Sequence, residues 1–307
     1  MKRCLAGLGL ILFFLCGTGF AQPADQVRNR QQLLQFQDSL VRLSTRIYNS
    51  GSEPERYNSN YTFIKTLISA LKTPRSFNFG FDSLKTVSIQ TAPDLRFRIF
   101  TWHVQNDDGS YRYYGTIQMN DPDGKLVMHP LVDFSAGFKK PADSVTSPDK
   151  WYGAQYYRII PVTSGVKDPY YILLGWKGNT PKTTKKVIEV LHFSGNKAQF
   201  GRQVFDGDKD NPQAKRVIFE YTRQVSMNLN YDPSKSMIVF DHLAPPDPKL
   251  KGKFEFYGPD MSYDVYKLVN GRWKLQEDVE MKNSPTDQDD EFNDPRKLKG
   301  GPPIRRF

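Results

Sequence analysis

Cysteine is almost missing from this sequence. The chain has only two, Cys4 and Cys16, and both lie in its first 21 residues, which have the pattern of a secretory signal peptide. If cleavage follows Ala21, the mature chain has no cysteine, which excludes disulfides, thiolate nucleophiles and zinc–cysteine sites. A protein exported without disulfides must be held together by its hydrophobic core, and residues 22–307 suffice for one large or two modest domains.

The signal-peptide prediction for residues 1–21 depends on three features. The first three residues carry two positive charges, and residues 5–15 form an apolar run that is too short for a bilayer core of about 30 Å. Gly19 and Ala21 are the small residues that a signal peptidase reads. We therefore expect export to the periplasm or the medium, with no transmembrane span after cleavage. Lipidation of Cys16 is not expected, because Leu15 precedes it and the small residues come after it.

Long runs of one charge are also missing. Without the two positive residues of the signal, 41 Lys and Arg face 33 Asp and Glu, a net charge of +8 that is spread along the chain. A dispersed surplus of this kind fits affinity for an anionic surface such as polysaccharide or phospholipid, and it also fits an ordinary solvated surface. We expect no nucleic-acid partner, because no recognisable binding module accompanies the charge.

Complete catalytic motifs are absent from the sequence. It has no Gly-x-Ser-x-Gly nucleophile elbow, no glycine-rich phosphate loop and no His-Glu-x-x-His motif. One of its four histidines, His242, follows Asp241 at the end of an expected strand. Neighbours on a strand point to opposite faces, so the pair would need the bend that Pro245 and Pro246 favour. Asp241 and His242 are the weak catalytic candidates, a strand-end turn is the alternative, and on balance we expect no enzyme.

Acidic residues alternate from Asp206 to Asp210, as at the start of a calcium-binding loop. An EF-hand would also need glycine at its sixth place and glutamate at its twelfth, where this chain has Asn211 and Val217. Asp206, Asp208 and Asp210 are therefore weak calcium candidates, and an acidic turn is the default interpretation. We expect no other cofactor.

Two segments at the start of the mature chain have helical periodicity. Apolar residues recur at steps of three and four along residues 26–48, at Leu33, Phe36, Leu40, Leu43 and Ile47. Residues 49–54 are expected to break this helix, and a second helix at residues 60–72 should end before Pro74. Residues 22–75 thus predict a helical hairpin that packs on the rest of the protein.

Beyond Phe77, aromatic and β-branched residues gather in short runs bounded by turn residues. About thirteen strands are expected, at 97–102, 111–117, 126–132, 156–162, 170–176, 186–193, 198–205, 216–222, 226–231, 237–241, 254–257, 263–269 and 273–279. No helix-length segment separates them, so the pairing should be antiparallel. Residues 76–282 predict a mainly β antiparallel meander, as a barrel, a sandwich or a small propeller-like fold. Polar residues 283–307 predict a flexible tail.

Aromatic residues make up 13% of the chain. Tyrosine pairs such as Tyr170-Tyr171 put one ring on each face of a strand, so half of these rings could lie outside the core, where they could grip sugar rings or apolar peptide segments. The alternative is that the rings fill a large β core. The weak binding candidates are Trp102, Tyr114, Trp176 and Asp260.

Several strand motifs, including Tyr170-Tyr171-Ile172-Leu173-Leu174-Gly175-Trp176 and Tyr257-Gly258-Pro259-Asp260, resemble a series found in secreted proteins of Bacteroidetes. The resemblance covers roughly residues 95–280, implies an envelope or extracellular setting, and brings with it no assigned activity and no catalytic residue. We expect an exported β-domain that binds a glycan, a peptide or an envelope protein. The alternatives are a structural or assembly component of the envelope, and a hydrolase or lyase around Asp241 and His242.

Overall fold

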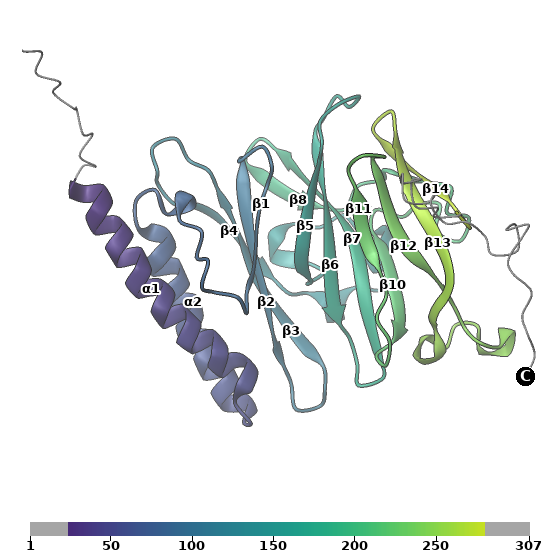
Figure 1. Cartoon of the computed structure of the whole chain (residues 1–307), viewed down its shortest axis with the longest axis horizontal. Helices are drawn as coiled ribbons and strands as arrows, with labels where there is room; N and C mark the ends of the chain where they lie inside the picture. The colour runs from purple at the N-terminus through teal and green to yellow at the C-terminus, as the bar shows by residue number, and fades with distance from the viewer. Residues whose placement is uncertain (1–23, 280–307) are drawn as a thin grey trace, which may run out of the picture.

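The computed structural model describes residues 24–279. The predicted signal peptide at residues 1–21, with both cysteines, and the predicted tail at 283–307 lie outside the described residues. The described part confirms a mainly β chain, because fourteen strands form three sheets that follow two N-terminal helices. Figure 1 shows these parts in succession along the long axis, from the helices at one end to the last sheet at the other. Within this part of the chain the sheets do not close into a barrel.

The predicted helical hairpin is present as α1 (Ala24–Asn49) and α2 (Glu53–Lys72). The second helix begins well before the predicted residue 60. Pro54 was expected to break the first helix, but it lies in the first turn of α2. Proline is tolerated there because the first N–H groups of a helix have no partner within the helix.

The three sheets follow one another along the chain. Sheet 1 has the order β1-β2-β3-β4, with β1 (Ser88–Thr91), β2 (Phe97–Gln105), β3 (Tyr111–Met119) and β4 (Val127–Val132). Sheet 2 has the order β10-β7-β6-β5, with β8 beside β7, and contains β5 (Gln155–Val162), β6 (Tyr170–Gly178), β7 (Thr183–Ser194), β8 (Lys197–Phe200) and β10 (Val217–Thr222). Sheet 3 has the order β11-β12-β13-β14-β9, from β9 (Phe205–Asp206), β11 (Leu229–Asp232), β12 (Met237–Ala244), β13 (Gly258–Val269) and β14 (Arg272–Gln276). The pairs are antiparallel, as predicted, apart from the short parallel pair of β14 and β9.

Some strand boundaries differ from the prediction. The single strand expected at 198–205 is divided into β8 and β9 by Gly201, whose φ of +88° lies in a region that favours glycine. Residues 254–256 form a short 3₁₀ turn instead of a strand, which shows that aromatic content alone does not specify a strand. β1 was missed because its four residues include only one apolar side chain, Ile89.

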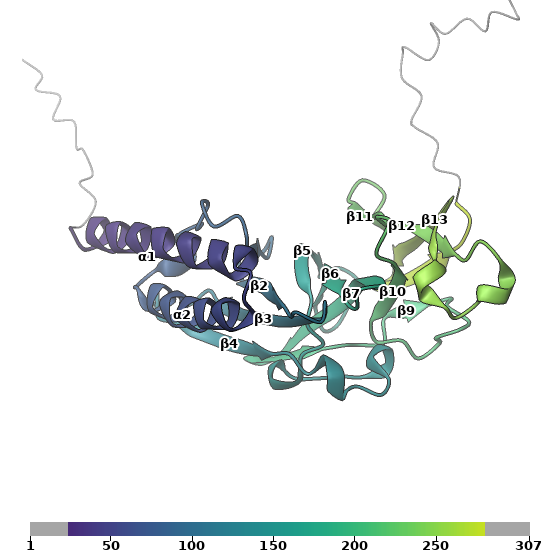
Figure 2. The same ribbon diagram turned by 90° about the horizontal axis from the view of Figure 1, so that it is seen from below.

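The helices and sheets stack as layers, so sheets 1 and 2 are covered on both faces (Figure 2). Alternation along β6 sends Tyr171 and Leu173 into the core shared with sheet 1, and Tyr170 and Ile172 into the core shared with sheet 3. Tyr170 and Tyr171 are each 1% exposed. For this pair the alternative holds, that the rings fill the core, because each face of sheet 2 meets another sheet.

Candidate functional site

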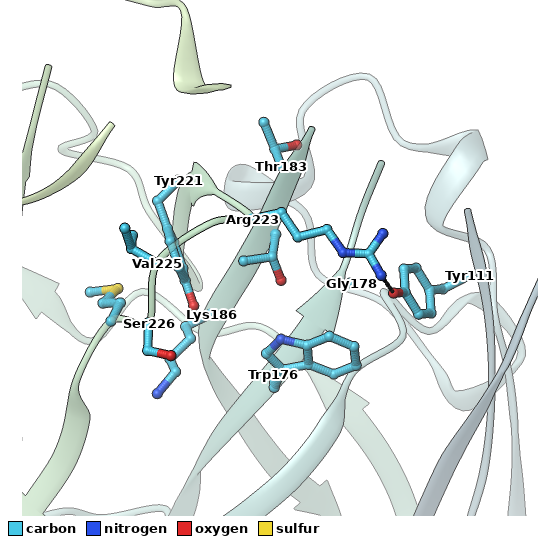
Figure 3. A pocket seen from close by; sticks show the side chains of 11 residues that line it. Tyr111, Trp176, Gly178, Thr183, Lys186, Tyr221, Arg223, Val225 and Ser226 are labelled. Carbon is cyan, nitrogen blue, oxygen red and sulfur yellow. Dashed lines mark hydrogen bonds between the residues drawn. The ribbon is translucent and has the colours of Figure 1, made fainter. Parts of the chain in front are cut away.

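A pocket of about 290 Å³ opens beside sheet 2, and Figure 3 shows the side chains that line it. Strands β6, β7 and β10 supply Trp176, Lys186 and Tyr221. Tyr111, at the start of β3 in sheet 1, forms one wall, and residues 225–227, on the way to β11 in sheet 3, form another. The pocket thus collects side chains from segments that are far apart in the sequence.

Strand register explains why these side chains share one face. Trp176 pairs with Lys186 across β6 and β7, and Gly178 pairs with Thr184 two residues further on. Because side chains two residues apart point the same way, all four belong to one face of sheet 2. Further along the strands this same face enters the core shared with sheet 3. The pocket is therefore a continuation of that face beyond the core.

The pocket wall is aromatic. The Trp176 ring lies 5.6 Å from the Tyr111 ring at an interplanar angle of 87°, and His103 lies 5.3 Å from each of them. Tyr111 lies so close to Gly178 that a Cβ at this glycine would be 2.5 Å from the tyrosine ring. Trp176 is also the one half-buried tryptophan of the four, since the other three are at most 2% exposed.

Behind this wall, burial lowers the pKa of the His103 imidazole to about 4. The His103 Nδ1 atom lies 3.0 Å from Gln155 Oε1, a hydrogen bond to a neutral amide. His103 therefore packs as a neutral ring at neutral pH and adds no charge to the pocket.

Two cations reach the pocket, and no acidic residue lines it. Arg223 Nη2 donates a hydrogen bond to the Tyr111 hydroxyl at 2.8 Å. Lys186 is half-buried, and its Nζ lies 5.4 Å from the centre of the Tyr157 ring. Burial lowers the pKa of the Lys186 ammonium, and the charge of Asp241 offsets part of this effect. Thr183, Thr184 and Ser226 add hydroxyl groups to this aromatic and basic lining. The Thr183 hydroxyl donates to Glu220 Oε1 at 2.8 Å and the Thr184 hydroxyl to the Lys177 carbonyl oxygen at 3.4 Å.

The sequence-predicted binding candidates do not form one site. Trp176 lies in the pocket, whereas Trp102 is 2% exposed and donates its Nε1 hydrogen to Asn60 Oδ1 at 2.7 Å. Tyr114 stacks beside Trp102 with ring centres 6.0 Å apart, and both line a small apolar cavity of about 150 Å³ next to α2. Asp260 lies on β13 and accepts hydrogen bonds from Ser262.

Sequence reasoning missed three pocket residues: Tyr111, Lys186 and Arg223. Lys186 had a weak signal, because it is a charged residue at the start of the apolar run of β7. Arg223 had none, since its contact with Tyr111 joins residues 112 positions apart in the sequence.

The predicted Asp241–His242 pair does not form. A register shift of β12 against β13 falls between Asp241 and Leu243. The Asp241 carboxylate accepts the Asn228 N–H at 2.7 Å, while His242 Nδ1 lies 2.8 Å from Asp264 Oδ2. The pair fails because the two side chains point to different neighbours, as strand alternation requires.

His242 lies between carboxylates at a solvated strand end, with 42% of its side chain exposed. Its Nε2 is 3.9 Å from Asp260 Oδ2, on the other side of the ring from Asp264. Burial lowers the pKa of the imidazole, but the hydrogen bond to Asp264 and the charges of Asp264, Asp260 and Glu277 outweigh it, so the pKa is raised. The flanking carboxylates thus favour the protonated form of the His242 ring.

The alternating acids do not form a calcium loop. Arg272 binds both oxygens of Asp206, at 2.7 and 2.6 Å, so this carboxylate is already paired. Asp208 Oδ1 accepts the backbone N–H groups of Asp210 and Asn211, at 2.9 and 3.0 Å, which closes an acidic turn. Among residues 24–279, no three His, Cys, Asp or Glu side chains are grouped as a metal site.

Lys177, next to Trp176 in the chain, lies on the opposite face of β6. Its Nζ donates to Ser135 Oγ at 2.8 Å and to the carbonyl oxygens of Tyr152 and Gly153 at 2.9 and 2.8 Å. Burial lowers the pKa of this ammonium to about 7. The contact with Ser135 resembles a serine–lysine pair, but Lys177 donates to the Ser135 hydroxyl, and that hydroxyl donates to the Asp133 carboxylate. The serine hydrogen therefore does not point at the lysine.

Comparison of the chain with protein-family models, curated proteins and solved structures finds no match. In the part of the chain from residue 24 to 279, no helix combines the length and the apolar character needed to cross a bilayer.

Proposed function

We propose that this chain is an exported binding domain that holds a sugar ring of an envelope or extracellular glycan in the pocket beside Trp176. The observation that carries the proposal is the pairing of Trp176 with Tyr111 at right angles, within a lining that also carries hydroxyl groups and two cations. A sugar ring has an apolar face of C–H groups and a rim of hydroxyls. An aromatic ring with polar groups around it complements both.

The chemistry of the lining favours binding over catalysis. The pocket residues include neither Asp, Glu, His nor Cys. Hydrolysis of a glycoside ordinarily requires two carboxyl groups, and none of the pocket residues carries one. The proposal therefore assigns no reaction to the pocket, and the predicted signal peptide supports its placement in a compartment where glycans occur.

The assembly alternative receives no specific support. It would use the apolar stripe of the helical hairpin as a docking face. That stripe is occupied, because Leu33, Leu40 and Ile47 are buried in the core that the helices share with sheet 1.

Titration of the mature chain, residues 22–307, with a panel of oligosaccharides tests the proposal. Trp176 is the reporter, because its indole N–H resonance should shift while those of the three buried tryptophans stay in place. Trp176→Ala should abolish binding without unfolding the protein, whereas Tyr61→Ala, which removes a 60% exposed tyrosine on α2, should have no effect. Glycan binding that persists in Trp176→Ala, or a panel in which no member shifts Trp176, would contradict the proposal.

A further inference from the structure

The loop between β12 and β13, residues 245–257, carries exposed aromatic rings and lysines. It contains two short 3₁₀ turns, Pro248–Leu250 and Phe254–Phe256. Figure 1 and Figure 2 both show it projecting from sheet 3, at the end of the molecule farthest from the helices. A loop in this position can meet an extended surface before the helices or sheet 1 do.

The two phenylalanines of this loop do not fill the core. Phe254 is 40% exposed and Phe256 is 46% exposed, and neither belongs to a hydrophobic cluster of the described chain. Val225, which is 41% exposed, lies beside the end of the loop, since its Cγ2 atom is 3.7 Å from where a Cβ at Gly258 would be. Exposed apolar side chains that gather in one place mark a surface that binds a partner.

Contacts within the loop and with β10 hold it in shape. The Phe254 ring lies 5.1 Å from the Tyr257 ring, and the Tyr257 hydroxyl accepts the Gly252 N–H at 3.0 Å. The Thr222 N–H donates to the Tyr257 carbonyl oxygen at 2.9 Å, and the Tyr257 ring packs against the core between sheets 2 and 3. The loop is thus ordered before it meets a partner, which lowers the entropy cost of binding.

Three lysines alternate along the loop, at Lys249, Lys251 and Lys253. All three are exposed, and none of them forms an ion pair with residues 24–279. Of the two acids in the loop, Asp247 accepts the backbone N–H of Lys249 at 2.8 Å and Glu255 is half-buried. The charge that the loop presents outward is therefore mainly positive.

We propose that residues 245–257 dock the protein on a bilayer that contains anionic phospholipids, with the two phenylalanines among the headgroups and the three lysines at the phosphates. The rings gain free energy by leaving water, while the ammonium groups stay at the charged interface. Val225 also lines the pocket, so docking holds the pocket next to the bilayer. The inference does not rest on the proposed function, because the pocket is lined by residues outside this loop.

Co-sedimentation of the mature chain, residues 22–307, with lipid vesicles tests the proposal. One set of vesicles contains equal amounts of phosphatidylglycerol and phosphatidylcholine, and the other contains phosphatidylcholine alone. We expect binding to the anionic set to be about tenfold or more tighter, and to weaken as salt rises from about 50 to about 300 mM. No binding to the anionic vesicles, or equal binding to both sets, would overturn the proposal.

Variants of the loop separate the two contributions. Lys249→Gln, Lys251→Gln and Lys253→Gln combined should weaken binding to anionic vesicles by about a hundredfold, because each lysine near such a surface contributes about fivefold. Phe254→Ser combined with Phe256→Ser should weaken it by about tenfold. Vesicle binding that neither variant changes would place the contact on another surface and overturn the proposal.

The control removes a similar pair of side chains at the other end of the molecule. Tyr61 on α2 is 60% exposed, and the Lys65 Nζ atom lies 4.2 Å from the centre of its ring. Tyr61→Ser combined with Lys65→Gln should bind vesicles as wild type does. Melting temperatures show that each variant is folded.

Insertion of the rings is measured separately from attraction of the lysines. Phe256→Trp places an indole in the loop, whose added fluorescence should shift to the blue on anionic vesicles and be quenched by phospholipids brominated on their acyl chains. Binding without this shift and quenching would be electrostatic attraction alone and would overturn the insertion. Dextran sulfate that binds the loop as tightly as the vesicles do would show a general polyanion site and overturn the lipid specificity.

Discussion

The two faces of strands β6 and β7 carry lysines in opposite situations. On the face toward sheet 1, Lys177 donates to three acceptors and Lys185 lies 3.0 Å from the Glu220 carboxylate. On the other face, Lys186 makes no hydrogen bond or ion pair with residues 24–279, and its Nζ lies 5.4 Å from the centre of the Tyr157 ring. These residues are neighbours in the sequence or in register, since Lys177 pairs with Lys185 and Trp176 with Lys186.

This difference separates a structural role from the proposed binding role. A buried cation with every donor engaged stabilises the loops that supply the acceptors, here residues 135–153 packed on sheet 2. A half-buried cation without an acceptor contributes nothing comparable to the fold. The comparison therefore predicts that substitutions on the two faces will affect different properties, stability on one and binding on the other.

The largest expected effect is on the stability of Lys177→Ala. Removal of the ammonium leaves two buried carbonyl groups without their donor and opens space beside Tyr113 and Tyr152, so we expect a loss of about 3 kcal/mol in the free energy of unfolding. Lys186→Gln should change it by less than about 0.5 kcal/mol. Urea denaturation of both variants is the measurement, and equal losses in the two would remove the distinction between the faces.

Acid should weaken the structure behind the pocket wall. The pKa of His103 falls from an ordinary value near 6.5 to about 4 in the folded protein, so the unfolded chain binds the extra proton first as the pH falls. The free energy of unfolding therefore keeps the full contribution of the neutral His103 ring above pH 6.5. It declines by up to about 3 kcal/mol as the pH falls from 6.5 to 4.

The measurement for His103 is the free energy of unfolding across this pH range in wild type and in His103→Gln. The variant should show a smaller decline than wild type, because it lacks the titrating ring. If the free energy of unfolding fell equally with pH in the two proteins, the acid sensitivity would come from residues other than His103.

Gly178→Ala should disturb the pocket more than the fold. Its new Cβ would collide with the Tyr111 ring, which must rotate away and lose its place against Trp176. We expect a loss of about 1 kcal/mol in stability, because a side chain and not backbone has to move, together with a clear change in Trp176 fluorescence. Unchanged fluorescence would show that Tyr111 does not hold the wall in place.

The smallest effect should come from His242. The pKa of its ring is raised by Asp264 and neighbouring acids. The protonated ring therefore stabilises the folded state fully below the ordinary histidine pKa of about 6.5, and this stabilisation is lost as the pH rises through the pKa of His242 in the folded protein. NMR titration of His242 in wild type and in Asp264→Asn should show a higher pKa in wild type. A pKa that does not move on removing Asp264 would contradict the assigned pairing.

Much of the fold could be predicted from local pattern. The helical hairpin, the antiparallel strands and most strand positions follow from periodicity and turn residues, since these depend on neighbours in the sequence. The same local reasoning named Trp176 as a binding candidate, because it is an aromatic residue on an expected strand, and Trp176 does line the candidate pocket. Trp102 shows the limit of this reasoning: it has the same pattern but lies under α2, which local sequence does not reveal.

Strand alternation in the sequence by itself determined that Trp176 and Lys177 face opposite sides of β6. That Lys186 shares a side with Trp176 follows from the register of β7 against β6, in which these two residues are paired. Tertiary structure alone decided which side became buried and which became a pocket. The physical reason is that cover and charge pairing come from distant segments. Ser135 and Tyr152 reach Lys177, and Glu220 reaches Lys185. Tyr111 and Arg223 enclose the other side, where Lys186 lies over the Tyr157 ring.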